Sequence, residues 1–304
     1  MPRINEIKQE KNTVQSVGGF AHSLQQIAAG RMAKLRKLVE DSRRFVDEAT
    51  VILREVELER VKRVKKELGL TKGQMQAVKK PKKNPAIKPE DEKFNTAIIV
   101  VSSNQGLSGS YNSEIVKKLD VVIPQFLDAD YYVLGHKGQE YFRRVSRKYN
   151  LHYYPYNVPE EVSIEDLRPL IGMFYHYDRI YMVYSKYINT ITREVVFVEL
   201  VVPPIEADIA EEERVAGKFI FEPSLDDVIR GISAHLRYAL FRQQILDSKL
   251  ALYTAQMIAM KTASDNAEDL LKDLQLQYNK ARRKEIDRKI QEVQAGRALW
   301  ADEE

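Results

Sequence analysis

A seven-residue repeat of apolar side chains near the carboxyl end constrains this chain more than any other feature. Two columns start at Ile229 and Ile232, and fourteen of their sixteen positions are hydrophobic, whereas a 44% hydrophobic composition predicts about seven. The first column is Ile229, Leu236, Gln243, Leu250, Met257, Ser264, Leu271 and Tyr278. The second is Ile232, Ala239, Leu246, Tyr253, Met260, Ala267, Leu274 and Ala281. No proline follows Pro223, so the pattern predicts one helix over residues 224–300, about 110 Å long.

The amino-terminal residues carry the same period. One column is Ile7, Val14, Ala21, Ala28, Leu35, Ser42, Ala49 and Val56, and the expected second column is Val17, Leu24, Arg31, Leu38, Phe45 and Ile52. Two long helices with matching seams predict an antiparallel, left-handed coiled coil. Gly18 and Gly19 weaken the first helix by about 1 kcal/mol each, which predicts either a bend or a close approach of the helices.

Between the two helices the pattern changes to alternating strands and helices. We expect strands at residues 96–101, 131–134, 179–184 and 195–202, and helices at residues 111–127, 137–149 and 163–176. This alternation predicts a Rossmann-like α/β domain with a mostly parallel sheet, inserted between the arms of the coiled coil. The predicted domains are residues 1–66 (first helix), 67–93 (linker), 94–222 (α/β domain) and 223–304 (second helix).

The predicted linker is rich in lysine and arginine and contains Pro81, Pro85 and Pro89. This composition is typical of a frayed helix end followed by a solvated segment. Attraction to acidic lipid headgroups or to an acidic partner subunit is the alternative, and the sequence leaves it open.

Composition excludes several classes of function. The net charge of +4 is small for a chain with 30% charged residues, so we expect no nucleic-acid partner. The absence of cysteine excludes disulfides and thiolate metal sites. The first ten residues lack the apolar stretch of a secretory signal, and no apolar run is long enough to span a bilayer.

Residues 102–112 form the best candidate for a ligand-binding loop, because they follow the first expected strand and open a helix. However, Gly109 is not followed by the lysine and Ser/Thr of a P-loop, and the third glycine of a dinucleotide fingerprint is missing. We therefore expect a tight strand-to-helix turn capped by Ser110 or Asn112. The five histidines have no metal-ligand spacing, so the sequence predicts no catalytic, cofactor or metal site.

Several ordered motifs resemble the gamma subunits of F-type ATP synthases. They are Met257-Ile258-Ala259-Met260-Lys261-Thr262-Ala263-Ser264-Asp265-Asn266-Ala267, Tyr278-Asn279-Lys280-Ala281-Arg282, Ile27-Ala28-Ala29-Gly30-Arg31-Met32, Gly106-Leu107-Ser108-Gly109 with Asn112, and Phe221-Glu222-Pro223-Ser224. The resemblance covers nearly the whole chain outside residues 58–93.

The resemblance implies a non-catalytic central rotor shaft, present once per complex. Its partners would be the alpha, beta and epsilon subunits and the membrane ring of c subunits, whose proton-driven rotation it would couple to ATP synthesis in the alpha/beta hexamer. Because the match begins at Glu6, with no room for a transit peptide, we expect a bacterial protein, peripheral on the cytoplasmic face of the cell membrane. A gamma-like shaft of another rotary or motility ATPase, and a nucleotide-binding α/β protein with helical arms, remain alternatives.

The resemblance also implies two sets of contact residues. The set facing the catalytic hexamer is Arg282, Arg283, Asp287, Lys289, Leu24 and Gln256. The set on the side of epsilon and the c-ring is Phe221, Glu222, Gly106, Gly109 and Asn112. In the first set only Arg282 keeps the family's residue type.

The seam of the second helix fails at Glu285 and Arg288, where Ile286, Ile290 and Val293 keep a helical stripe of their own. We therefore expect a paired lower part and a single-helix tip from Arg282 onward.

Overall fold

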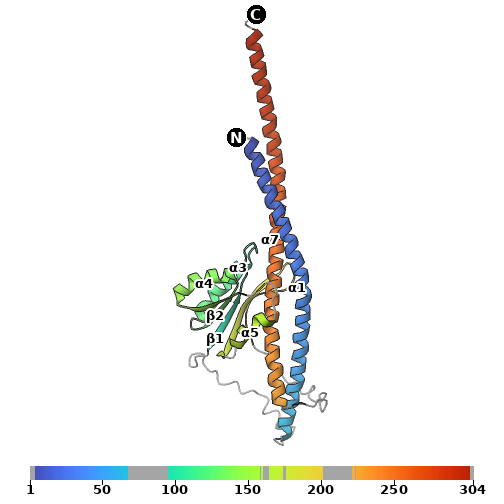
Figure 1. Cartoon of the computed structure of the whole chain (residues 1–304), viewed down its shortest axis with the longest axis vertical. Coiled ribbons are helices and arrows are strands. Elements are labelled where there is room, and N and C mark those ends of the chain that lie inside the picture. Colours follow the sequence, from blue (N-terminus) through green and yellow to red (C-terminus); the bar gives the residue numbers. More distant parts are fainter. Residues whose placement is uncertain are drawn as a thin grey trace. The chain divides into compact units, whose positions relative to one another are not determined.

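The computed structural model describes residues 4–67, 95–157, 159, 164–173, 176–200, 221–222 and 224–301. Two long helices, α1 (Ile4–Glu67) and α7 (Leu225–Ala301), enclose in sequence a five-stranded sheet and its shorter helices (Figure 1). The helix predicted over residues 224–300 is confirmed. The predicted basic linker lies outside the described residues, and the proposed domain boundaries stay predictions.

The chain divides into two compact units. We call Met1–Met32, Leu107–Gly109 and Tyr253–Glu304 the coiled-coil unit, and Ala33–Gly106 with Ser110–Leu252 the sheet unit. The long helices contribute to both units.

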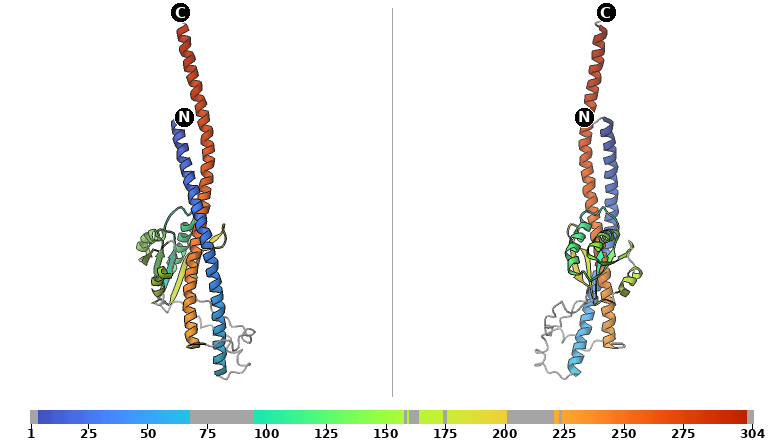
Figure 2. Two further views of the ribbon diagram at one scale, coloured as in Figure 1. Left: turned by 45° about the vertical axis from the view of Figure 1, so that its right-hand side comes forward. Right: turned by 90° about the vertical axis from the view of Figure 1, so that its left-hand side faces the viewer.

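In each unit α1 and α7 run antiparallel, as predicted (Figure 2). In the coiled-coil unit, Lys11 bonds Gln275, and Arg31 lies 5.6 Å from the ring centre of Tyr253. In the sheet unit, Arg60 pairs with Asp226 at 3.2 Å. Residue numbers therefore rise on α1 as they fall on α7. All sixteen positions of the two α7 columns are buried or half-buried, which confirms that seam.

The second column expected on α1 is wrong. All its members are exposed; Phe45, for example, is 56% exposed. The column one residue later is the one that faces α7, and Val39 and Leu53 in it are 1% and 2% exposed. In a heptad seam, steps of three residues alternate with steps of four. Here each member of the first column is followed by the next seam residue four positions later, as from Val14 to Gly18, and not three positions later. Both candidate columns are apolar enough, so only packing against α7 distinguishes them.

Gly18 belongs to the seam column and marks a close approach of the two helices. A Cβ atom at Gly18 would lie 3.1 Å from the Cβ of Ala267, whereas a Cβ at Gly19 would meet nothing within 4 Å. Of the two expectations for this pair of glycines, the close approach therefore holds at Gly18.

The sheet has the strand order β3-β2-β1-β4-β5. Strands β1 (Thr96–Val101), β2 (Asp130–Leu134), β3 (His152–Tyr156) and β4 (Arg179–Tyr187) are parallel, and β5 (Arg193–Glu199) pairs antiparallel with β4. The mostly parallel sheet is thus confirmed. Its central strand β1 is buried on both faces, which explains its continuous apolar run. Strand β3 was not predicted, because its sequence contains Pro155 and lacks aliphatic residues.

Helices cover both faces of the sheet. Helices α3 (Tyr111–Val122) and α4 (His136–Tyr149) pack on one face, and a short 3₁₀ helix, η1 (Ile123–Gln125), follows α3. On the other face, α5 (Ile164–Met173) and α7 join a core with β1, β2 and β4. Phe241 of α7 is fully buried in this core. The sheet unit therefore holds a segment of α7 as one of its own core helices.

Candidate functional site

The end of α7 is a single helix. In Figures 1 and 2 the carboxyl end of α7 continues past the beginning of α1 within the coiled-coil unit. Every side chain described from residue 282 to residue 294 is exposed except that of Glu285, which is half-buried. The expected single-helix tip from Arg282 onward is confirmed.

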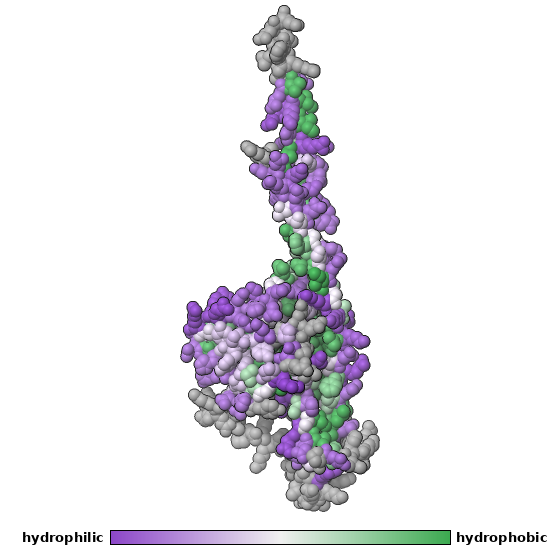
Figure 3. Space-filling model, in the orientation of Figure 1, coloured by the Kyte–Doolittle hydropathy of each residue, from purple (hydrophilic) through white to green (hydrophobic). Residues whose placement is uncertain are grey.

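The tip carries an exposed apolar stripe. Ile286, Ile290 and Val293 are 44%, 50% and 59% exposed. Their spacing places them on one face of the helix. Figure 3 shows this part of the surface as apolar groups among hydrophilic ones. A continuous apolar face on a bare helix is typical of a surface that contacts a partner.

The charged residues of the tip differ in how they are paired. Lys289 lies 3.4 Å from Glu285, and Arg288 lies 3.3 Å from Glu292. Within the part of the chain that the structure describes, Arg282 and Arg283 form no ion pair. Their guanidinium groups are therefore available to acidic groups of a partner.

The structure does not bring Leu24 and Gln256 to the tip. Gln256 precedes Arg282 by 26 positions on α7, which corresponds to about 39 Å of helix. It is half-buried, whereas Leu24 is 36% exposed in the outward-facing column of α1. The six residues assigned to the catalytic hexamer thus form at least two separate surfaces.

The turn after β1 is held by hydrogen bonds within the protein. The Ser102 hydroxyl donates to the Leu134 carbonyl at 2.7 Å and accepts from the Gly138 amide at 2.9 Å. A Cβ at Gly138 would lie only 2.6 Å from that hydroxyl, so a larger residue there would have to displace it. The Ser103 amide donates to Asn112 Oδ1 at 3.2 Å. These polar groups fasten the turn to the starts of α3 and α4.

Two glycines of this turn have different surroundings. Gly109 has a φ of +55°, and a Cβ there would lie 3.5 Å from the Cβ of Ala259 in α7. Gly106 is exposed. Ser110 occupies the cap position of α3 but makes no capping bond; instead, Arg193 Nη2 donates to its hydroxyl at 2.6 Å. The expectation of a side-chain cap by Ser110 is therefore wrong.

Phe221 and Glu222 lie just before α7. Phe221 is half-buried, with the guanidinium carbon of Arg63 5.4 Å from its ring centre, and Glu222 is exposed. Ser224 caps α7 by accepting the Asp227 amide at 3.2 Å, and its hydroxyl donates to the Asp227 carboxylate at 2.6 Å. This bond, with that from Arg230, holds the pKa of Asp227 below its ordinary value. The expected entry to the second helix thus has a defined start.

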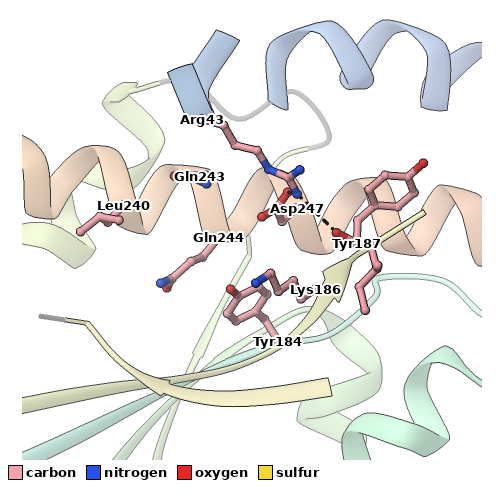
Figure 4. Close-up of a pocket in the computed structure, with 9 residues that line it drawn as sticks. Arg43, Tyr184, Lys186, Tyr187, Leu240, Gln243, Gln244 and Asp247 are labelled. Atoms are coloured by element: carbon pink, nitrogen blue, oxygen red, sulfur yellow. Dashed lines mark hydrogen bonds and ion pairs between the residues drawn. The ribbon is translucent and has the colours of Figure 1, made fainter. Parts of the chain in front are cut away.

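A cavity of about 560 Å³ lies in the sheet unit between α1, α7 and the end of β4 (Figure 4). On its wall, Arg43 Nη2 donates to Asp247 Oδ1 at 2.7 Å and to the Tyr187 carbonyl at 3.3 Å. The Asp247 side chain is 3% exposed. Its burial raises its pKa, and the charge of Arg43 acts in the opposite direction.

Sequence reasoning missed the Arg43–Asp247 pair. The available signal was a carboxylate directly after two apolar residues, Ile245 and Leu246, the second of which belongs to the seam. Such a group needs a partner, but the sequence does not say which cation supplies it.

No group of three or more His, Asp or Glu side chains suited to a metal occurs among the described residues. A search of the same residues for a helix long and apolar enough to cross a membrane also found none.

The comparison with known proteins agrees with this architecture. A family model described as ATP synthase matches residues 3–299. Among curated relatives, the ATP synthase gamma chains of Streptococcus pyogenes serotype M49 (strain NZ131) and serotype M5 (strain Manfredo) are each 27% identical over 303 residues. Each match covers 96% of this chain and 97% of the relative.

Two solved structures share the fold. The central stalk and c-ring structure of the Tetrahymena thermophila mitochondrial ATP synthase contains a chain with a TM-score of 0.54 and 18% identity. That match covers 81% of this chain and 99% of the other. A chain of the Euglena gracilis mitochondrial ATP synthase (OSCP/F1/c-ring) has a TM-score of 0.52 and 13% identity, covering 89% and 95%.

Because the family model spans nearly all of its length, the chain belongs to the ATP synthase family. Its relatives place it with the gamma chains, so it is a rotor subunit of an F-type ATP synthase and a non-catalytic part of that complex. The resemblance drawn from the sequence motifs is confirmed.

Proposed function

We propose that this subunit transmits the proton-driven rotation of a c-ring to the alpha/beta hexamer and thereby drives ATP synthesis there. The observation that carries the proposal is the single-helix end of α7, which extends beyond the two-helix seam with an exposed apolar stripe and with Arg282 and Arg283, which form no ion pair in the described part of the chain. A shaft that turns inside a ring of other subunits needs a surface that those subunits can contact, and the exposed side chains of the tip provide one. The proposed partners are the alpha, beta and epsilon subunits and the c-ring, with one copy of the chain per complex.

Within this function, the residues facing the hexamer are Arg282, Arg283, Asp287, Lys289, Leu24 and Gln256. Arg282 and Arg283 are the strongest members, because both are exposed and lack an ion-pair partner in the described part of the chain. Lys289 already lies near Glu285, so a partner carboxylate would compete with that contact. Leu24 and Gln256 would meet the hexamer at a lower level than the tip.

On the side of epsilon and the c-ring, Glu222 and Gly106 are exposed and suit direct contact. Gly109, Asn112 and Phe221 pack or bond within the chain, so they would act by shaping that surface. The proposed location is the cytoplasmic face of a bacterial cell membrane, where the subunit is held by its partners.

A tagged copy of the chain, purified from its native membranes, tests the partners. We expect alpha, beta, epsilon and c subunits to co-purify. Recovery of the chain with a different set of subunits and no c-ring would contradict the proposal.

Leu271→Pro tests the shaft. Proline removes a helix hydrogen bond in the middle of the coiled-coil unit and costs about 3 kcal/mol or more. We expect ATP synthesis in reconstituted vesicles to fall while nucleotide binding by the hexamer persists. Leu271→Met, which keeps an apolar side chain, is the control, and unchanged synthesis in the proline variant would disprove the shaft role.

Arg282→Ala tests the tip. We expect a change in the rate of ATP hydrolysis or in its coupling to proton transport, because a charged contact with the hexamer is lost. Lys272→Ala is the matched control, because Lys272 is an exposed cation that already contacts Glu268 and Asp269. If Arg282→Ala behaves like this control, the assignment of Arg282 is wrong.

A further inference from the structure

Two successive residues of α7 are buried and bond in different directions. Asp247 accepts from Arg43 of α1, and the same Arg43 amino group also reaches the Tyr187 carbonyl at the end of β4. Ser248 is fully buried, and its hydroxyl lies 2.8 Å from the hydroxyl of Tyr111 in α3. All five residues belong to the sheet unit. One turn of α7 is thereby bonded to α1 and to α3, and Arg43 links α1 further to the end of β4.

Few polar residues of α7 are buried as whole residues, although single side-chain atoms of Gln243 and Gln244 are buried too. Among the described residues of α7, those buried are Asp247, Ser248 and Thr254, and the remaining buried positions are hydrophobic. Burial of a polar group is unfavourable unless it is hydrogen-bonded, so apolar residues would fill the same space at lower cost. The placement of the polar pair at one turn calls for a role other than filling space.

Directional bonds supply what apolar packing lacks. Apolar contact is largely non-directional, so it resists separation of two elements better than slow rotation of one against the other. Neighbouring residues on a helix point about 100° apart. A turn of α7 about its own axis that kept the Asp247 bond would therefore break the Ser248 bond.

We propose that Arg43, Asp247, Tyr111 and Ser248 form a grip that fixes the rotational position of α7 in the sheet unit and carries torque between them. These are positioning residues, and the proposal rests on the rotor function proposed above. Figure 4 shows Arg43 reaching across from α1 to Asp247 and to Tyr187 beside the cavity.

The partial exposure of the ion pair supports a geometric role over a stabilising one. Arg43 is 37% exposed toward the cavity while Asp247 is 3% exposed. A pair with one solvated and one buried member gains little net stability, because removing the carboxylate from water offsets much of the attraction. The ion pair still fixes the direction in which the Asp247 side chain points from α7.

The test uses the complete ATP synthase reconstituted in vesicles, with Arg43→Gln, Tyr111→Phe and the double variant. Each lost hydrogen bond should raise the population of slipped α7 positions about fivefold. We expect hydrolysis without a proton gradient to be retained. Proton pumping per ATP hydrolysed should fall, and fall further as an opposing gradient grows. A merely structural defect would lower both quantities together, independent of the gradient.

Arg36→Gln is the control, because Arg36 is also on α1 and pairs with the exposed Glu40. Pumping per ATP equal to wild type in the double variant at every gradient would overturn the grip. If the double variant does not assemble, Tyr111→Phe decides alone, since it removes one oxygen and keeps the buried ring. Leu271→Pro in the same preparation separates the rotor function from the grip. If Leu271→Pro uncouples proton pumping from ATP hydrolysis and the grip variants do not, only the grip proposal is wrong.

Discussion

The close approach at Gly18 gives the sharpest test of the coiled-coil register, because its neighbour Gly19 provides an internal control. Replacing Gly19 by alanine should raise the free energy of unfolding by about 0.5–1 kcal/mol, since a helix interior favours alanine and nothing lies within 4 Å of the new methyl group. Gly18→Ala has the same backbone gain. Its methyl carbon, however, would lie 3.1 Å from that of Ala267, closer than the favourable 3.5–4.0 Å separation of carbon atoms. We therefore expect Gly18→Ala to be less stable than Gly19→Ala.

A larger side chain widens the difference. Gly18→Leu must push the helices apart, and overpacking of this kind costs about 1–3 kcal/mol. Gly19→Leu points away from α7 and should change stability by no more than about 0.5 kcal/mol. The assay is urea unfolding of the purified chain, followed by circular dichroism and compared at its midpoints.

Ala267→Gly identifies the contact itself. Combined with Gly18→Ala it makes room for the new methyl group, so the double variant should be more stable than the two single effects predict. A coupling energy of about 0.5 kcal/mol or more is expected for residues in contact. Equal effects of leucine at the two glycines, or zero coupling with Ala267, would refute the register.

Two further predictions concern the sheet unit. Phe241→Ala should lower the free energy of unfolding by about 3–5 kcal/mol, because Phe241 is fully buried in the sheet core; Phe45→Ala, at a residue that is 56% exposed, should have a much smaller effect in the same urea assay. Burial raises the pKa of Tyr111 from 10.0 to about 12, so the folded state keeps this proton longer than the unfolded state. Its contribution to stability is complete below pH 10 and is lost as the pH rises through about 12, by up to ~2.7 kcal/mol. Tyr111→Phe should flatten the alkaline fall of the unfolding midpoint; an unchanged fall in this variant would contradict the assignment of the fall to Tyr111.

Much of the fold is predictable because it depends on local periodicity. The α7 seam repeats over more than ten turns, so occasional polar members such as Gln243 do not obscure it. The parallel strands β1, β2 and β4 are largely apolar runs that lie between helices in the sequence, and this pattern is typical of buried strands. Strand β3 lacks this signal, because an edge strand is hydrogen-bonded on one side and tolerates Pro155 and the exposed Tyr154.

What the sequence could not provide is information about pairs of residues far apart in the chain. The choice between the α1 columns of Val17 and Gly18 depends on the surface of α7 that each meets, and both columns have heptad spacing. The partner of Asp247 could not be predicted for the same reason, because Arg43 is 204 positions away in the sequence. The motifs that carry the family resemblance identified the tip at Arg282, but they gave no sign of the Arg43 contact.

The distribution of burial along α7 separates two kinds of substitution. Beyond Leu274 no described side chain of this helix is buried, whereas positions 229–274 include all of its buried residues. Substitutions of the buried residues between positions 229 and 274 should lower the free energy of unfolding of the chain, because they remove apolar contacts or buried hydrogen bonds. Substitutions of the exposed Arg282, Ile286, Ile290 and Val293 remove no buried side chain of the described part of the chain, so we expect them to act when partners are present. Arg282→Ala should therefore leave the urea midpoint of the isolated chain unchanged; a lowered midpoint would mean that the tip is folded against the chain itself, and the exposed stripe could not then serve as the surface that turns inside the hexamer.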